Sequence, residues 1–374
     1  MKAAIAIVLF STAAGAYPSM IRHGYTQCSS CHTDPSGGSL LTDYGRAQSE
    51  VLLSSRWGAR DDAEASSRSK FLFGAAPASE HVILGGWWRN GYIWNVADGK
   101  LVDHRSLQMR ADFAAEVRVG SFRAAGQLGY AGSGAPLAAV NRGDDVVSRE
   151  HWVGVSFASD AGLVRAGRLN VPFGLRNVEH ISFVRTATQT DINQDQQYGA
   201  AIAFAGESWR AEGMAILGNY SLRPDAFRER GFAGYFEAAL SPRVALGLSA
   251  LATRADVALD GGGPSLRQAY GVTARVAPWK ELVVQAEVDA LLTSKLGSSV
   301  HAGQAGWLQA DVELLQGIHL LSAVEDLQAT TGGSTQFGVW GGMAWFVIPH
   351  LDIRADWVRR SSIDTWLVQF NGYL

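Results

Sequence analysis

The stretch Leu107–Val119, LQMRADFAAEVRV, decides how the rest of this 374-residue sequence is interpreted. Apolar residues occupy every second position, and polar, charged or small residues lie between them. The apolar set is Leu107, Met109, Ala111, Phe113, Ala115, Val117 and Val119. Side chains two positions apart point to the same face of a β-strand, so the pattern predicts a strand with one apolar and one largely polar face.

The same alternation recurs along the chain in short segments separated by clusters of Gly, Asp, Asn, Ser and Pro. The predicted strands are 81–94, 104–119, 121–131, 147–158, 161–169, 196–206, 208–219, 231–241, 243–255, 265–277, 280–292, 302–316, 317–327, 335–347, 349–359 and 363–374. Their number is even, as in single-chain bacterial outer-membrane barrels. We therefore predict an all-β fold over residues 80–374, a transmembrane antiparallel β-barrel of about sixteen strands.

The composition agrees with a barrel in a membrane. The chain has 42 Gly and 12 Trp, and charged residues make up 18%, against about 25% in soluble domains. A soluble sandwich would need a second apolar set to build a core, and none is evident. The net charge of −3 gives no basic footprint for nucleic acid. Long predicted connections mostly follow odd-numbered strands, which places both termini on the periplasmic side.

Residues 1–16 predict an export signal. Lys2 precedes an apolar stretch that ends in the small residues Ala14-Gly15-Ala16, so we expect cleavage after Ala16. The remaining N-terminal region, residues 17–79, should then be exported with the barrel. Within it, residues 39–57 have apolar residues at helical spacing, and residues 58–70 are polar enough to be a linker.

The motif Cys28-Ser29-Ser30-Cys31-His32 predicts one covalent haem c. The two thiols can form thioethers to the porphyrin vinyl groups, and His32 is then placed as the proximal iron ligand. These are the only two cysteines in the sequence, so no further cysteine can complete a zinc site. A redox-active C-x-x-C pair and a chance match are the alternatives, but no thioredoxin-like βαβ pattern accompanies the motif. His23 and Met20 are the nearest candidates for the distal ligand, which stays open.

The stretch Gly167–Leu175, GRLNVPFGL, resembles a segment of porins of the phosphate-selective type. In such porins the connection that follows folds into the lumen. The resemblance implies that Arg176, His180 and Arg185 lie at a pore constriction, whereas an ordinary outer loop would leave them in solvent. The basic ladder that would select phosphate is not recognisable in this sequence.

A second resemblance covers residues 17–46, YPSMIRHGYTQCSSCHTDPSGGSLLTDYGR. This stretch is similar to exported bacterial proteins that carry one haem motif before a predicted outer-membrane barrel. It implies a monohaem c-type cytochrome segment at residues 17–79, mainly irregular or helical, fused to the barrel.

Two functions follow as expectations. The first is electron transfer at or across the bacterial outer membrane, with periplasmic redox proteins or other cytochromes as partners. The second is a passive diffusion porin for small solutes, in which the haem segment is a plug, sensor or structural staple. The haem segment is expected on the periplasmic side or in the lumen, the barrel among lipids, and a homotrimer is conceivable by likeness to porins. No catalytic constellation is evident, so we do not expect an enzyme.

Overall fold

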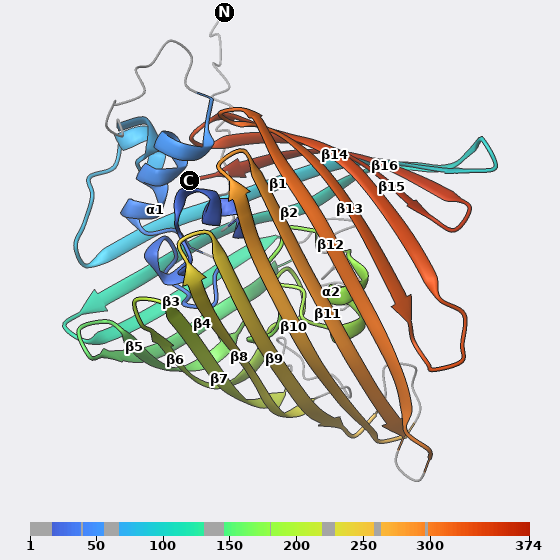
Figure 1. Ribbon diagram of the computed structural model, residues 1–374. Coiled ribbons are helices and arrows are strands. Elements are labelled where there is room, and N and C mark those ends of the chain that lie inside the picture. The colour runs from blue at the N-terminus through green and yellow to red at the C-terminus, as the bar shows by residue number, and fades with distance from the viewer. Residues whose placement is uncertain are drawn as a thin grey trace, which may run out of the picture.

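The computed structural model describes residues 17–38, 40–55, 67–130, 146–179, 181–218, 229–257, 263–295 and 298–374. Sixteen antiparallel strands close into one barrel, in which each strand pairs with its sequence neighbours and β1 pairs with β16 (Figure 1). The strands are β1 (Val82–Ala97), β2 (Lys100–Val119), β3 (Phe122–Tyr130), β4 (Val146–Phe157), β5 (Gly162–Leu169), β6 (Gln197–Ala205), β7 (Trp209–Gly218), β8 (Arg230–Ser241), β9 (Val244–Ala255), β10 (Ser265–Trp279), β11 (Leu282–Lys295), β12 (His301–Leu315), β13 (Ile318–Gln328), β14 (Gln336–Ile348), β15 (Leu351–Arg360) and β16 (Ile363–Tyr373). The predicted sixteen-stranded all-β barrel is confirmed.

Each predicted strand corresponds to an observed one, and the largest difference lies at the start of β2. The sequence predicts that this strand begins at residue 104, but the β1–β2 hairpin continues to Lys100. Asp98 and Gly99 form its two-residue turn with φ values of 51° and 73°. An Asp-Gly pair with both φ angles positive favours the tightest hairpin connection, and the alternation alone does not reveal it.

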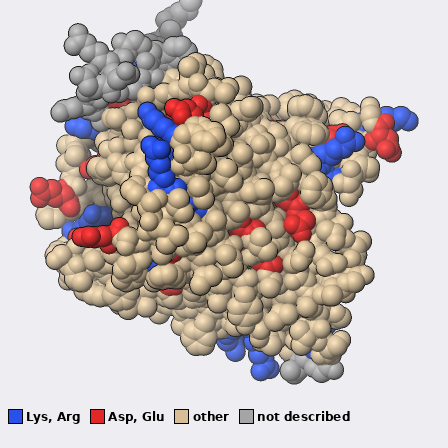
Figure 2. Space-filling model, viewed as in Figure 1, with Lys and Arg blue, Asp and Glu red and all other residues tan. Residues whose placement is uncertain are grey.

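The two faces of the strands have the polarity that a membrane barrel requires. On β2, Glu116 is fully buried inside, whereas Phe113 on the opposite face is 50% exposed. On β11, Glu287 is buried and Val288 is 60% exposed. Uncharged side chains cover most of the face shown in Figure 2. Carboxylates inside and apolar side chains outside are the reverse of a soluble protein and suit a hydrocarbon surround.

Two segments fill part of the lumen. One is the N-terminal segment, residues 17–55, and the other is the inward loop, residues 170–196, between β5 and β6. Figure 1 shows the blue N-terminal helices at one mouth of the barrel, near the C-terminus, and α2 within the ring of strands. The short helices are η1 (Pro18–His23), η2 (Cys28–Ser30), α1 (Asp43–Gln48), η3 (Ser49–Leu53), η4 (Ser67–Ser69), η5 (Phe71–Gly74) and α2 (Phe183–Thr188). No described helix is long and apolar enough to cross a membrane.

The lumen is not uniformly polar, although the sequence predicts a polar inner face. Phe173 and Val184 of the inward loop pack with Leu251 and Trp307 of the barrel wall in one buried apolar cluster. The alternation does not predict this cluster, because its inner half comes from a loop without strand periodicity. The inward loop is therefore a packed part of the fold.

Candidate functional site: a cavity at the short-turn mouth

The N-terminal segment is docked inside the barrel mouth that carries the short turns. Ser49 Oγ donates a hydrogen bond to the carbonyl of Pro349 at 3.3 Å, and the Ser55 amide donates to the carbonyl of Phe346 at 2.8 Å. Both acceptors lie at the β14–β15 turn. The Gln27 side-chain amide donates to the carbonyl of Gly206, in the β6–β7 turn, at 3.1 Å. These contacts on separate turns place the segment across the mouth.

A buried arginine fastens this segment to the barrel wall. Helix η1 begins at Pro18, whose fixed φ suits a first turn, and it ends at Gly24, whose φ is 82°. Between them, Arg22 is 3% exposed, with Nη2 at 2.8 Å from the Asp311 carboxylate and Nη1 at 3.5 Å from that of Glu313. Both carboxylates belong to β12. The ion pairs fix η1 against the inner wall.

The haem motif forms a compact turn beside η1. The amides of Cys31 and His32 both donate to the carbonyl of Cys28, at 3.1 and 3.0 Å. Helix α1 packs so closely on this turn that a Cβ on Gly45 would lie 2.3 Å from the Cys31 carbonyl oxygen. Both cysteines are partly buried and free of a disulfide. Close packing of backbone against backbone therefore holds the motif in this turn.

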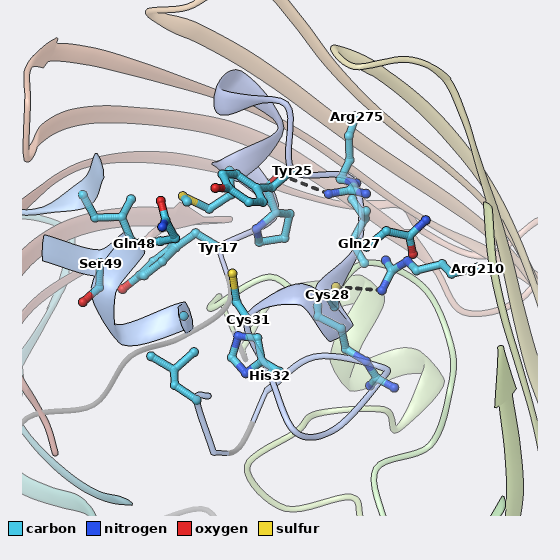
Figure 3. Close-up of a pocket in the computed structure, with 17 residues that line it drawn as sticks. Tyr17, Tyr25, Gln27, Cys28, Cys31, His32, Gln48, Ser49, Arg210 and Arg275 are labelled. Atoms are coloured by element: carbon cyan, nitrogen blue, oxygen red, sulfur yellow. Dashed lines mark hydrogen bonds between the residues drawn. The ribbon is translucent and has the colours of Figure 1, made fainter. Parts of the chain in front are cut away.

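The three motif side chains line one cavity, with empty space of about 670 Å³ that extends into open solvent (Figure 3). Apolar side chains complete much of the lining; they are Pro18, Met20, Leu41, Leu53 and Leu175. The cavity is formed jointly by the N-terminal segment, the inward loop and the barrel wall.

The haem itself stays a prediction, and the residues at the cavity are of the kinds that would hold it. His32 is buried, and its Nδ1 lies 2.6 Å from the carbonyl oxygen of Gly38. A carbonyl can only accept, so Nδ1 carries the proton and Nε2 holds the lone pair that iron ligation uses. Burial and the neighbouring Cys28 raise the pKa of the Cys31 thiol to about 11. Cys28 has a different neighbour, the Arg210 guanidinium with Nη1 2.7 Å from Sγ, and a reactive thiol typically has such a cation beside it, so a redox-active C-x-x-C pair stays an alternative.

The two candidates for the distal ligand lie in different places. Met20 lines the cavity together with Cys28, Cys31 and His32. His23 is not among the lining residues. Burial of its imidazole and the positive charges of Arg22 and Lys280 lower the pKa of His23 to about 4. The geometry thus favours Met20 over His23 as a distal ligand.

An aspartate that the sequence analysis missed holds the motif loop to the barrel. Asp34 is 1% exposed, and its carboxylate accepts from the Ser36 amide at 2.8 Å and from Asn170 Nδ2 at 3.1 Å. Arg165 Nη2 of β5 lies 2.9 Å from the same carboxylate. Burial alone would raise the pKa of Asp34, but Arg165 holds it well below its usual range. The Asp34-Pro35-Ser36-Gly37 sequence signals a turn, but nothing local indicates the distant Arg165.

The inward loop crosses the lumen to the opposite wall. The Leu175 amide donates to Glu287 of β11 at 2.9 Å, and the Phe183 amide donates to Glu325 of β13 at 2.8 Å. The charged side chains of the loop also pair with the wall: Arg185 pairs with Glu287.

The predicted constriction at Arg176, His180 and Arg185 stays a prediction, and of these residues Arg176 and Arg185 lie near enough for their charges to act on each other. Arg176 lines the cavity at the short-turn mouth. Arg185 is instead buried against Glu287, where it holds the loop to the wall. His180 lies outside the described residues. The signal peptide 1–16 and most of the predicted linker 58–70 also lie outside them.

The fold is that of porin-type outer-membrane barrels. Outer-membrane expressed OmpT of Vibrio cholerae superposes with a TM-score of 0.61 at 11% identity, over 80% of this chain and 99% of that one. An anion-selective porin from Comamonas acidovorans gives 0.56 at 12% identity, over 78% and 99%. Pseudomonas putida OprB gives 0.57 at 9% identity, over 79% and 94%. No protein-family model and no curated protein matches the chain. At these identities the likeness concerns the fold alone.

Proposed function

We propose that this protein is a porin-type channel of the bacterial outer membrane whose periplasmic mouth is plugged by a haem-bearing N-terminal segment. In this proposal Cys28 and Cys31 carry the haem and His32 is its proximal ligand. The observation that carries the proposal is the cavity in which the motif, the inward loop and the barrel wall meet. The apolar exterior and the solved porins of the same fold support the membrane location. One of those relatives, OmpT of Vibrio cholerae, has a trimer form, and we propose the same assembly here.

The chain's own residues would give the haem a structural role. The turn at Cys28–His32 presents two thiols and one imidazole to the same cavity. Leu41 and Leu53 exclude water from part of it, while Asp34 ties the motif loop to β5 through Arg165. A haem attached there would stiffen the plug, because it would replace empty cavity with packed, covalently held surface.

The test combines haem detection with conductance. Haem staining after denaturing electrophoresis should be positive for the native chain and negative for the Cys28→Ser, Cys31→Ser variant. In planar bilayers the haem-free variant should open more often to small ions, because its plug is less stable. A haem-free native chain, expressed with the cytochrome c maturation system, would contradict the haem assignment. Equal conductance of the native and variant proteins would contradict the plug.

Electron exchange with a periplasmic redox protein is the second candidate. It is favoured by the opening of the cavity to solvent: Tyr25 lines the cavity, and its hydroxyl lies 2.5 Å from that of Tyr44, which is 49% exposed. The bound haem would supply one-electron redox chemistry. In proteoliposomes, a reduced soluble cytochrome on the plug side should reduce the haem faster than one on the other side. Equal rates from both sides would remove this candidate.

A further inference from the structure

The cavity that holds the haem motif is lined by three guanidinium groups and, among the described residues, by no carboxylate. The three are Arg176 of the inward loop, Arg210 of β7 and Arg275 of β10. Just behind them Glu237 pairs with Arg210, at 3.0 Å between Nε and Oε1, and also with Arg275. The carboxylates of Asp34 and Glu212 also act on Arg176, but neither lines the cavity. The lining itself is therefore cationic, which suits an anionic group on whatever fills the cavity.

Arg176 is the lining arginine for which the described residues show no direct ion pair; Asp34 and Glu212 act on it only from farther away. It is 6% exposed, its Nη2 donates to the carbonyl of Val171, and its Nη1 is buried with no hydrogen-bond partner in the described structure. No ion pair of Arg176 is found within the described residues either. A buried guanidinium without an anion is strongly destabilising.

The other two guanidinium groups are already engaged. Arg210 Nη1 lies 2.7 Å from Cys28 Sγ, so it occupies the edge where a thioether would form (Figure 3). Arg275 donates to the carbonyls of Pro18 and Thr26, at 3.3 and 2.9 Å, in addition to its pairing with Glu237. Among the three, only Arg176 has a terminal nitrogen, Nη1, with no hydrogen-bond partner in the described structure.

We propose that Arg176 binds a carboxylate group of the haem attached to Cys28 and Cys31. This inference rests on the proposed haem. The cofactor brings two carboxylates, both on the edge of the macrocycle away from the thioethers. A guanidinium can donate two parallel N–H bonds to such a group, and the pair is strongest where water is excluded. The haem then joins the plug, through Cys28 and Cys31, to the inward loop, through Arg176.

A double-mutant cycle tests this pairing by thermal unfolding in detergent. Arg176→Gln is made in the haem-bearing chain and in the Cys28→Ser, Cys31→Ser background. With haem, the substitution should lower Tm, because a buried carboxylate loses its partner. Without haem, it should raise Tm or leave it unchanged, because an unpaired buried charge is removed. Shifts of the same sign and size in both backgrounds would overturn the proposal.

Arg185→Gln is the matched control. Arg185 belongs to the same loop and is buried, but it pairs with Glu287 and does not line the cavity. Its substitution should lower Tm equally in both backgrounds. A second readout does not need the haem-free chain to fold: Arg176→Gln should lower the haem midpoint potential, because a nearby cation favours the reduced iron. Arg176→Lys should restore part of this shift, and an unchanged potential in both variants would overturn the proposal.

A free anion could bind Arg176 in the same way as a haem carboxylate. Inorganic phosphate is the probe that distinguishes these two partners. If the haem carboxylate fills the site, phosphate should raise Tm through Arg176 only in the haem-free variant. If phosphate raises the Tm of the haem-bearing chain and Arg176→Gln abolishes the effect, the site binds free anions and the haem assignment of Arg176 is wrong. A native chain without haem would instead refute the proposed function itself.

Discussion

Replacing Arg22 with methionine should release the N-terminal plug from the barrel mouth. Arg22 is buried and faces the carboxylates of Asp311 and Glu313 at 2.8 and 3.5 Å. Methionine retains much of the apolar stem but leaves the two acids without their cation. Breaking a buried pair by removing one partner costs about 3–5 kcal/mol. His319 Nδ1, at 2.8 Å from Asp311, compensates in part, so the lower end of that range is expected.

A loss of about 3 kcal/mol lowers the equilibrium constant for plug docking by roughly 150-fold, at 1.36 kcal/mol per factor of ten. The assay is single-channel recording in planar bilayers, together with proteinase K digestion of the N-terminal segment in detergent. Arg22→Met should show more frequent open events and faster cleavage than the native protein. The Asp311→Asn substitution, added to Arg22→Met, should recover part of the closed population because it removes one stranded charge.

Arg230→Met is the control. Arg230 and Asp256 form an ion pair at 3.7 Å whose side chains are 55% and 58% exposed, and such pairs contribute at most about 1 kcal/mol. This variant should behave like the native protein. The reasoning fails if Arg22→Met is as closed and as protease-resistant as Arg230→Met. It also fails if the barrel unfolds before the plug is released, because the pair would then support the wall.

Two further predictions concern the plug. Met20→Ala should change the visible spectrum and lower the midpoint potential of the haem, because thioether ligation favours Fe(II), whereas His23→Ala should leave both unchanged; the opposite pattern would make His23 the distal ligand. Acid should also release the plug. The pKa of His23 is lowered to about 4 by burial, so docking is favoured above the unfolded pKa of about 6.5 and weakens as pH falls toward 4. Protease sensitivity measured across this range should rise in acid for the native chain and less so for His23→Gln; identical curves would exclude His23 as the cause.

The fold was predictable because lipid imposes a strict rule on every strand. Val117 and Glu116 must point to opposite faces, one to hydrocarbon and the other to the lumen. The alternation of apolar and polar residues can therefore be recognised from neighbouring positions in the sequence. The local spacing of Cys28, Cys31 and His32 also marks them as one group, and the three side chains line one cavity, whereas the haem itself stays a prediction. Short-range chemistry of this kind can be recognised from one sequence.

The contacts that build the site were not predictable in this way. Arg22 meets Asp311, and Asp34 meets Arg165, although the partners lie far apart in the sequence. An inward-facing arginine has the same local sequence pattern whether it meets solute, a carboxylate or a cofactor. Only the register of the closed barrel and the course of the inward loop decide which partner it has.

The partners of the charged side chains also decide which ions the lumen can select. Two ion pairs join charged side chains of the inward loop to the barrel wall: Arg185 with Glu287 and Glu179 with Arg354. Side chains that form such ion pairs present little net electric field to a passing ion, because opposite charges a few ångströms apart cancel at longer range. Arg176 is different, since the described residues give it no direct ion pair and it lines the cavity at the short-turn mouth. If the proposed haem fills that cavity, Arg176 holds it there and does not meet a permeating solute, so any selectivity of the channel must arise where loop and N-terminal segment leave an opening.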